Sequence, residues 1–207
     1  MTRGESRTMI AGPAGALEIA LNLPDADVEP RGLALVAHPH PQQGGTLDNK
    51  VAQTLARTFA GLGYVGIRFN FRGAGKSEGS FDDGRGETDD ALAALAHGRD
   101  AYPALASVPP VLAGFSFGTF VQTRVARSVA PERMVLVAPA VARFSSDPLP
   151  ADTIVIHGEV DDVVPLAQVF AWARPLELPV VVFPGCGHFF HGRLAQLQRA
   201  IAGMWQR

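Results

Sequence analysis

The stretch Val111-Leu-Ala-Gly-Phe-Ser-Phe-Gly118 decides the fold of this chain. Residues 111–115 carry no polar side chain, which predicts a buried strand, and residues 117–129 have the pattern of a helix. Ser116 and the glycines on its two sides match the pattern G-x-S-x-G at a tight turn between a strand and a helix. Such a turn strains the serine, and the glycines leave room for the neighbouring strand and helix. A simple N-cap serine, with glycines for close packing, is the alternative explanation.

The same alternation of a short apolar run, a turn marked by glycine or proline and a helical segment continues along the chain. It predicts strands over 16–23, 33–37, 64–70, 111–115, 134–138, 153–157 and 180–183. It predicts helices over 49–60, from 87 or 88 to about 97, over 117–129, from about 165, and over 193–205, with Asp48 capping the first. Strands rich in Val, Ile and Leu belong to a mostly parallel sheet with helices on both faces, so the fold class is α/β. The length of 207 residues predicts a single domain over 1–207.

Composition and charge exclude several classes of protein. Hydrophobic residues make up 47% of the chain and charged residues only 18%, which fits neither a disordered chain nor a coiled coil. The 18 basic and 20 acidic residues form no run of like charge, so we expect neither a nucleic-acid partner nor an anionic membrane. Prolines and glycines interrupt the uncharged stretch 101–123, so no membrane span is predicted. The N-terminus does not fit a signal peptide, and we expect a cytoplasmic protein.

Candidate functional residues follow the predicted strands, because ligands of a parallel sheet bind beyond the carboxyl ends of its strands. A serine hydroxyl becomes a strong nucleophile only beside a base that takes its proton. His188 follows the last predicted strand and is the candidate base. His191 is the alternative, although its position at the start of the last helix favours a capping role. The acid that orients the base is expected after the preceding strand, where Glu159, Asp161 and Asp162 all qualify by spacing.

The motifs G-F-S-F-G, H-G-E-V-D-D-V-V-P and G-C-G-H-F-F, in this order, resemble the α/β-hydrolase superfamily. The resemblance implies an α/β-hydrolase fold with the triad Ser116, Asp161 and His188, and it leaves Asp162 to cap the following helix. The segments 38–50, H-P-H-P-Q-Q-G-G-T-L-D-N-K, and 70–77, N-F-R-G-A-G-K-S, are similar to a group of small bacterial hydrolases that lack a lid. Roughly fourteen residues separate the strands that end at 138 and start at 153, too few for a cap domain.

The segment 38–45 occupies the place of the loop that supplies one oxyanion donor in this superfamily. The other donor is the N–H of the residue after the nucleophile, here Phe117. The prolines on both sides of His40 have no N–H, so the amide of His40 is the donor expected from this loop. The imidazoles of His38 and His40 either belong to the site or are loop side chains satisfied by backbone partners.

Other conspicuous side chains have structural explanations. Arg72 is expected to tie down its glycine loop through a carboxylate such as Asp82, with binding of a substrate anion as the alternative. Gly73 and Gly75 lack the third glycine of a nucleotide-binding loop. Cys186 lies near two histidines in sequence but near no other cysteine or acid, so we expect a packed thiol and no metal. No cofactor is implied.

Together these features predict a serine hydrolase that cleaves carboxylic esters or thioesters through an acyl-enzyme intermediate. Its substrate would be a small molecule or an acyl group on a carrier. A serine peptidase or amidase is the second hypothesis, because the same triad cleaves amides, although no acidic patch for an amino terminus is visible. A non-catalytic α/β-hydrolase scaffold is the third. The phenylalanines that either line an acyl groove or pack in the core are Phe115, Phe117, Phe144, Phe189 and Phe190.

Overall fold

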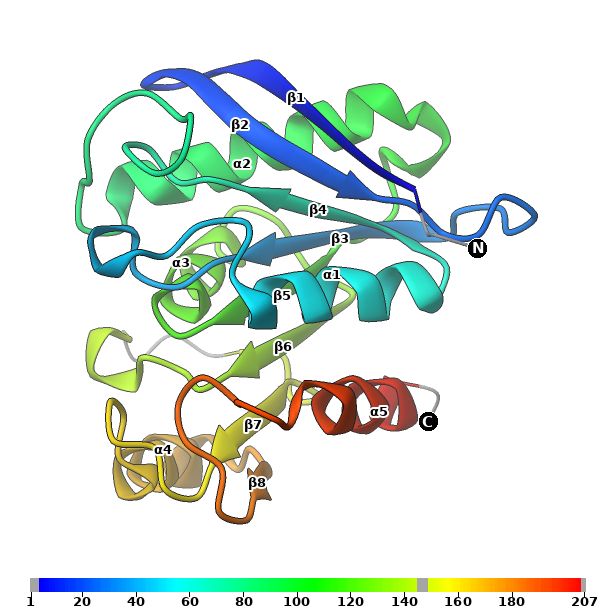
Figure 1. Cartoon of the computed structure of the whole chain (residues 1–207). Coiled ribbons are helices and arrows are strands. Elements are labelled where there is room, and N and C mark those ends of the chain that lie inside the picture. Colours follow the sequence, from blue (N-terminus) through cyan, green and yellow to red (C-terminus); the bar gives the residue numbers. More distant parts are fainter. Residues whose placement is uncertain (1–3, 145–148, 206–207) are drawn as a thin grey trace.

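The computed structural model describes residues 4–144 and 149–205. Over these residues, an eight-stranded sheet has the order β1-β2-β4-β3-β5-β6-β7-β8 (Figure 1). The strands are β1 (Glu5–Gly12), β2 (Gly15–Asn22), β3 (Gly32–Ala37), β4 (Tyr64–Phe69), β5 (Val111–Phe115), β6 (Arg133–Val137), β7 (Ile154–Gly158) and β8 (Val180–Phe183). The helices are α1 (Lys50–Gly61), α2 (Arg85–Ala101), α3 (Phe117–Val125), α4 (Leu166–Ala173) and α5 (Leu194–Trp205).

The sheet is parallel from β4 across to β8 and antiparallel at its first edge. β3 pairs in parallel with both β4 and β5, and parallel pairing continues through β6 and β7 to β8. β1 and β2 form an antiparallel hairpin, and β2 pairs antiparallel with β4. The expected mostly parallel sheet is therefore confirmed. Because these six strands run the same way, their carboxyl ends meet at one edge of the sheet, where a binding site is expected.

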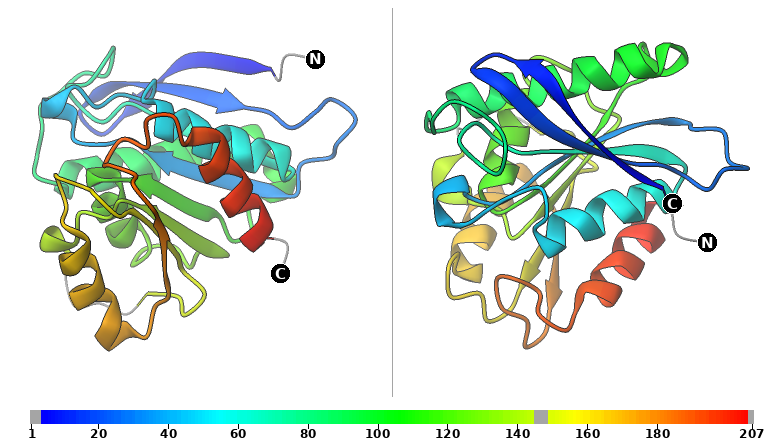
Figure 2. Two further views of the ribbon diagram at one scale, coloured as in Figure 1. Left: turned by 60° about the horizontal axis from the view of Figure 1, so that its bottom comes forward. Right: turned by 45° about the horizontal axis from the view of Figure 1, so that its top comes forward.

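Helices cover both faces of the sheet, as the sequence predicts (Figure 2). α1 and α5 pack on one face, where Phe59 and Trp205 belong to the same core cluster. α2 and α3 pack on the other face, where Leu95 and Val121 lie in a second cluster. α4 covers β7 through a smaller cluster that includes Val169. Burial on both faces explains why the central strands show continuous apolar runs rather than an alternation with polar residues.

The first edge strand, β1, is absent from the sequence-based prediction. Most of its residues are exposed, and Glu5 and Arg7 interrupt any apolar run. A strand of this kind carries no hydrophobic signal, and it is held instead by its backbone pairing along the whole of β2. The hairpin therefore follows from tertiary pairing rather than from local pattern.

Two helix starts differ from the prediction for reasons of capping. Asn49, not Asp48, caps α1, because the Asn49 side-chain oxygen accepts from the N–H groups of Val51 (2.9 Å) and Ala52 (3.3 Å). α2 begins at Arg85 rather than at 87 or 88. The carboxylate of Glu87, inside the first turn, accepts from the N–H groups of Asp82 (2.8 Å) and Gly84 (2.7 Å) and so closes the start of the helix. In addition, α3 ends at Val125, four residues before the expected end.

The connection between β6 and β7 contains no cap domain in its described part. That part holds a single 3-10 turn, Val141–Arg143. The described part of this connection adds no separate layer over the carboxyl edge, in keeping with the expected α/β-hydrolase fold without a cap domain. Among the described residues, no helix combines the length and the apolar character needed to cross a membrane.

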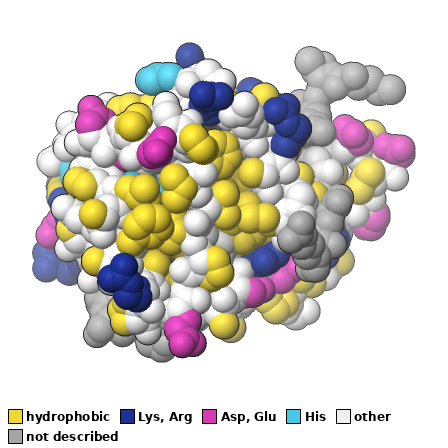
Figure 3. Space-filling model, turned by 90° about the horizontal axis from the view of Figure 1, so that it is seen from below, with side chains coloured by type: hydrophobic (Ala, Val, Ile, Leu, Met, Phe, Trp, Pro, Cys, Tyr) yellow, Lys and Arg dark blue, Asp and Glu magenta, His cyan; other side chains and the backbone are white. Residues whose placement is uncertain are grey.

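The second edge of the sheet is apolar. All four residues of β8 are half-buried, and hydrophobic side chains gather over the middle of the face seen from below (Figure 3). By contrast, charged side chains on this face lie mostly towards its margins.

The ring of Phe59 joins α1, β4 and α5 within the core cluster under α1 and α5, which we call the first core. It supplies a test of that core. Phe59 is fully buried, and its ring makes edge contacts with Tyr64 (6.0 Å between centroids) and Trp205 (5.0 Å). We expect Phe59→Ala to lower the free energy of unfolding by about 3–5 kcal/mol, because it leaves a cavity among three elements. Phe170→Ala, at a position 40% exposed on α4, is the matched control and should cost under about 1 kcal/mol. Urea unfolding measures both, and similar losses in the two variants would contradict this account of the core.

Candidate active site

Ser116 lies in a sharp turn between β5 and α3. Its backbone has φ 53° and ψ −120°, a conformation that side-chain-bearing residues rarely adopt. A Cβ atom on Gly114 would lie 2.7 Å from the backbone of Gly118, and one on Gly118 would overlap the carbonyl oxygen of Ala37 in β3. Both positions of the G-x-S-x-G pattern therefore need glycine for a close backbone approach. The turn is anchored by the Ser116 N–H, which donates to the carbonyl of Val137 (3.0 Å).

The structure brings Ser116, His188 and Asp161 together. Nε2 of His188 is 3.0 Å from Oγ of Ser116, and Nδ1 is 2.8 Å from Oδ2 of Asp161. An ionised carboxylate can only accept, so Nδ1 carries a proton and Nε2 is left to accept from the serine hydroxyl. All three residues are buried. The three side chains come from the loops after β5, β7 and β8, so distant stretches of chain form one continuous hydrogen-bonded path.

Asp161 uses its two carboxylate oxygens for different partners. Oδ2 faces His188, while Oδ1 accepts from the N–H groups of Val163 (2.9 Å) and Val164 (2.8 Å). Burial tends to raise the pKa of Asp161, but the hydrogen bonds from His188 and the two amides outweigh it and lower the pKa below its ordinary value. The carboxylate therefore stays ionised at neutral pH and holds both the imidazole and its own loop.

His157 is a further member of this loop structure that the sequence does not single out. Its buried ring donates from Nε2 to the carbonyl of Val164 (2.8 Å) and lies 3.4 Å from Oδ2 of Asp161. Burial lowers the pKa of His157, so the ring is neutral at physiological pH. Within the H-G-E-V-D-D-V-V-P motif, the histidine thus fixes the loop that carries the acid.

The other candidates for the base and the acid lie elsewhere. Asp162 is exposed and, contrary to the expectation, does not cap α4, whose first turn has no side-chain cap. The N–H groups at the start of this loop's turn are bound by Asp161, which also binds His188, and not by Asp162. Glu159 turns towards the next loop and accepts from the N–H of Gly185 (2.7 Å). His191 is exposed and its ring packs beside Phe189, 5.8 Å between centroids.

His40 and Phe117 lie next to each other beside the serine. Phe117 is the first residue of α3, so its N–H has no carbonyl partner within the helix. The carbonyl of His40 accepts from the N–H groups of Gln43 and Gly45, each at 3.0 Å, which fixes the turn after His40. The rings of His40 and Phe117 are 4.9 Å apart between centroids. Both His40 and Ser116 line one small cleft of about 130 Å³.

The imidazole of His38 is satisfied by backbone partners. Nδ1 donates to the carbonyl of Pro39 (2.6 Å), and Nε2 accepts from the N–H of Phe71 (3.1 Å). Complete burial lowers the pKa of His38 to about 3, with the Pro39 carbonyl acting weakly in the opposite direction. The neutral ring therefore connects the loop after β3 to the loop after β4.

Arg72 has a structural partner, but it is not the expected one. Its guanidinium binds the buried carboxylate of Asp90 in α2 (2.8 and 3.0 Å), and its backbone N–H donates to the same group (2.9 Å). The expectation of Asp82 is wrong because Asp82 instead accepts from Arg85 and from the N–H of Gly86 at the start of α2. The pairing depends on where each carboxylate lies along or before α2. It therefore cannot be predicted until the helix is positioned against the loop of Arg72.

Cys186 is buried against the first core, and burial raises the pKa of its thiol. No group of three or more histidine, cysteine or acidic side chains among the described residues could hold a metal ion.

Comparison with known families identifies the fold family. The sequence model of the family described as X-Pro dipeptidyl-peptidase (S15 family) matches residues 16–147, from β2 to the segment after β6, and includes Ser116. The chain belongs to this family of α/β hydrolases. The matched stretch includes the turn at Ser116 but ends before Asp161 and His188.

Solved structures agree with this family and with the absence of a lid. An alpha-beta serine hydrolase homologue from Coxiella burnetii is 37% identical, with a TM-score of 0.88 and 95% of each chain covered. An α/β serine hydrolase without a lid from Xanthomonas campestris is 36% identical, with a TM-score of 0.90 over 100% of this chain and 95% of that chain. An uncharacterised protein of Rickettsia prowazekii (strain Madrid E) is 30% identical over 92% of this chain and 84% of its own length.

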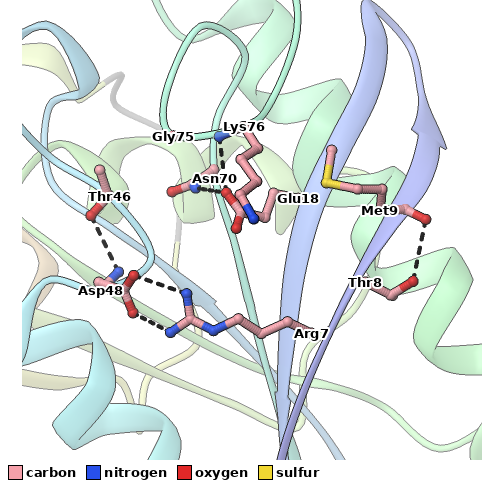
Figure 4. A pocket seen from close by; sticks show the side chains of 9 residues that line it. All are labelled: Arg7, Thr8, Met9, Glu18, Thr46, Asp48, Asn70, Gly75 and Lys76. Atoms are coloured by element: carbon pink, nitrogen blue, oxygen red, sulfur yellow. Dashed lines mark hydrogen bonds and ion pairs between the residues drawn. The ribbon is translucent and has the colours of Figure 1, made fainter.

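A second, larger cleft of this hydrolase, about 400 Å³, lies where the β1–β2 hairpin meets the loops after β3 and β4 (Figure 4). Its polar side chains bind one another: Arg7 pairs with Asp48, and the carboxylate of Glu18 accepts from the side chain of Asn70 (2.7 Å) and the N–H of Lys76 (2.9 Å). None of its described lining residues is a histidine or a serine. Of these two clefts, the smaller one around Ser116 is therefore the one in which a serine hydroxyl lies beside an imidazole.

The close approach at Gly118 yields a test of the elbow. We expect Gly118→Ala to lower stability and to reduce any reactivity of Ser116, because the added methyl group overlaps the backbone of β3. Gly203→Ala, in the exposed side of α5 with nothing within 4 Å of the new methyl, is the matched control and should be neutral or stabilising by up to about 1 kcal/mol. Urea unfolding and labelling with a fluorophosphonate measure the two effects. An unchanged Gly118→Ala protein would contradict the packing argument.

The buried neutral His38 predicts a pH dependence of folding. Its pKa is about 3 in the folded protein and about 6.5 in an unfolded chain, so between these values the unfolded state binds a proton that the folded state does not. Stability is therefore complete above pH 6.5 and falls towards acid pH, by up to about 1.4 kcal/mol per pH unit from this group. His38→Gln should show a shallower fall between pH 7.5 and 5 in urea unfolding, whereas His191→Gln, at an exposed position, should keep the wild-type slope. Equal slopes in all three proteins would refute the assignment.

Proposed function

We propose that this α/β hydrolase cleaves carboxylic esters or thioesters, with Ser116 as nucleophile, His188 as general base and acid, and Asp161 as the group that orients His188. The observation that carries the proposal is the continuous path from the serine hydroxyl through both imidazole nitrogens to an ionised carboxylate, at 3.0 and 2.8 Å. A strained elbow, a base in the required tautomer and a buried acid are the parts that nucleophilic catalysis by serine needs.

The reaction proceeds in two halves. Nε2 of His188 takes the hydroxyl proton as Oγ of Ser116 attacks the carbonyl carbon, and the amides of Phe117 and His40 stabilise the oxyanion that forms. His188 then gives this proton to the leaving oxygen or sulfur as its bond to carbon breaks, which leaves an acyl-enzyme. Water then gives a proton to the same Nε2 as its oxygen attacks the acyl carbon. His188 returns this proton to Oγ of Ser116 as the bond from Oγ to carbon breaks, which releases the acid and restores the free enzyme.

Ester or thioester hydrolysis is better supported than peptide hydrolysis. A dipeptidyl-peptidase must hold the charged amino terminus of its substrate, and burying an ammonium group needs a carboxylate partner. Among the described residues that line the cleft around Ser116, none is Asp or Glu, and the polar ones are His40, Gln43, Asn49, Ser116 and His188. The family description nevertheless makes peptidase activity the second candidate, to be tested on dipeptide amides with a free amino terminus.

Labelling and hydrolysis test the proposed roles directly. We expect a fluorophosphonate to label Ser116 in the wild-type protein and Ser116→Ala to abolish labelling, with kcat for p-nitrophenyl acetate reduced by about 10⁴-fold or more. Asp161→Asn should lower kcat by a similar factor while the fold is kept, because the amide favours the wrong imidazole tautomer. Ser80→Ala, an exposed serine of the glycine loop, is the matched control and should behave as the wild type.

Three results would contradict the proposal. Labelling at another residue would reassign the nucleophile, and no labelling at all would favour a non-catalytic scaffold. Faster turnover of a dipeptide amide than of matched esters would favour the peptidase.

A further inference from the structure

The cleft around Ser116 has two unlike walls. One wall comes from the loop after β3 and is lined by Pro39, Gln43, Gly44, Gly45 and Asn49, two of which carry side-chain amides. The other wall is apolar and consists of Val163, from the loop after β7, and Phe189, from the loop after β8.

Both apolar side chains of this wall face solvent: Val163 is 53% exposed and Phe189 47%. We call these two residues the apolar rim. Exposed groups of large hydrophobic side chains beside a cleft mark places where a ligand is bound, since water gains entropy when they are covered. The rim therefore offers binding energy to whichever part of a substrate lies next to it.

The rim is rigidly attached to the triad. The N–H of Val163 is held by Oδ1 of Asp161 at 2.9 Å, and the ring of Phe189 packs edge-on to His188, 5.1 Å between centroids. The two loops are also joined to each other, because the N–H of Val160 donates to the carbonyl of Cys186 (3.0 Å). A group bound on the rim is thus positioned relative to the imidazole without a prior ordering of the loops.

The chemistry of the proposed reaction determines which part of the substrate lies against the apolar rim. His188 must return its proton to the leaving atom, so that atom lies within hydrogen-bond reach of Nε2 as the bond to carbon breaks. The oxyanion lies on the other side, at the amides of His40 and Phe117. The leaving group is therefore directed to the side of His188, which is the side of the apolar rim.

We propose that Val163 and Phe189 form the subsite for the leaving group, so that the enzyme prefers esters or thioesters of apolar alcohols or thiols. The acyl group lies on the other side of Ser116, against the polar wall. The whole cleft, with both walls included, measures only about 130 Å³, which favours a short acyl chain. This inference rests on the proposed function and adds its substrate class. The group transferred is the acyl group, and the alcohol or thiol leaves with the proton from His188.

Two series of substrates distinguish the effect of the leaving group on kcat/KM from the effect of the acyl group. The first is ethyl, butyl and hexyl acetate, whose alcohols differ little in acidity. The second is the ethyl esters of acetic, butyric and hexanoic acid. kcat/KM is measured from acid release in a pH-stat. All acetates form the same acetyl-enzyme, so differences within the first series arise in binding and acylation rather than in deacylation.

We expect kcat/KM to rise about two-fold for each methylene added to the alcohol, which is the effect of half-burying a methylene group. It should stay level or fall as the acyl chain grows. Phe189→Ala and the near-isosteric Val163→Thr should each reduce the ratio of hexyl to ethyl acetate. Phe170→Ala, an exposed phenylalanine of α4 outside the cleft, is the matched control and should keep both the ratio and the activity on ethyl acetate.

Each other outcome overturns the inference in a recognisable way. A dependence on acyl length that Phe189→Ala removes would assign the rim to the acyl group instead. A hexyl-to-ethyl ratio near one, or one that both rim variants leave unchanged, would show that the rim does not contact the leaving group. If Ser116 is labelled by a fluorophosphonate in these cases, only the leaving-group subsite fails. If Ser116 is not labelled, the proposed function fails with it.

Discussion

The close approach of the start of α3 to the backbone of β3 is the constraint on which the site depends. It is possible only because Gly114 and Gly118 lack side chains, and it holds Ser116 in a conformation that costs about 1–3 kcal/mol. Hydrogen bonds to neighbouring backbone compensate this strain: the Ser116 N–H donates to Val137, and both the N–H and the hydroxyl of Thr119 donate to the Ser116 carbonyl. This turn therefore fixes the position of the Ser116 hydroxyl, which lies within hydrogen-bond distance of His188.

The loops around this elbow are braced by buried polar groups. Asp161 binds an imidazole with one oxygen and two loop amides with the other. His38 joins the loops after β3 and β4, and His157 secures the loop that carries Asp161 through its bond to the Val164 carbonyl. Because an unpaired buried polar group is costly, Asp161 and His38 each hold two segments in place at once. Among the described residues, the result is a preorganised site at the carboxyl edge of the sheet, and in the proposal above its two walls select the substrate.

Local pattern was sufficient for most of the central sheet and insufficient at its margins. The apolar runs of β3, β5 and β7 are signals of burial on both faces, and the glycine-flanked Ser116 marks its own turn. β1 carries no such signal, because an exposed edge strand is held by backbone pairing and by contacts with residues distant in sequence, such as the ion pairs of Glu5 with Arg68 and of Arg7 with Asp48. The start of α2 depends on Glu87, whose carboxylate closes the helix from within its first turn, and charge pattern alone does not separate that role from simple solvation.

The sequence by itself determined the α/β architecture, the turn at Ser116 and the order in which the candidate serine, acid and histidine follow three strands, since these depend on periodicity and on residue types at turns. By spacing, the motif after β7 left three acids equivalent, and the resemblance to a family was needed to prefer Asp161. Only the tertiary structure decided that Asp162 caps nothing, that Arg72 pairs with Asp90 and that an apolar rim stands on the side of His188. These are contacts between segments distant in sequence, and which side chains meet is set by the twist and packing of the sheet rather than by any local pattern.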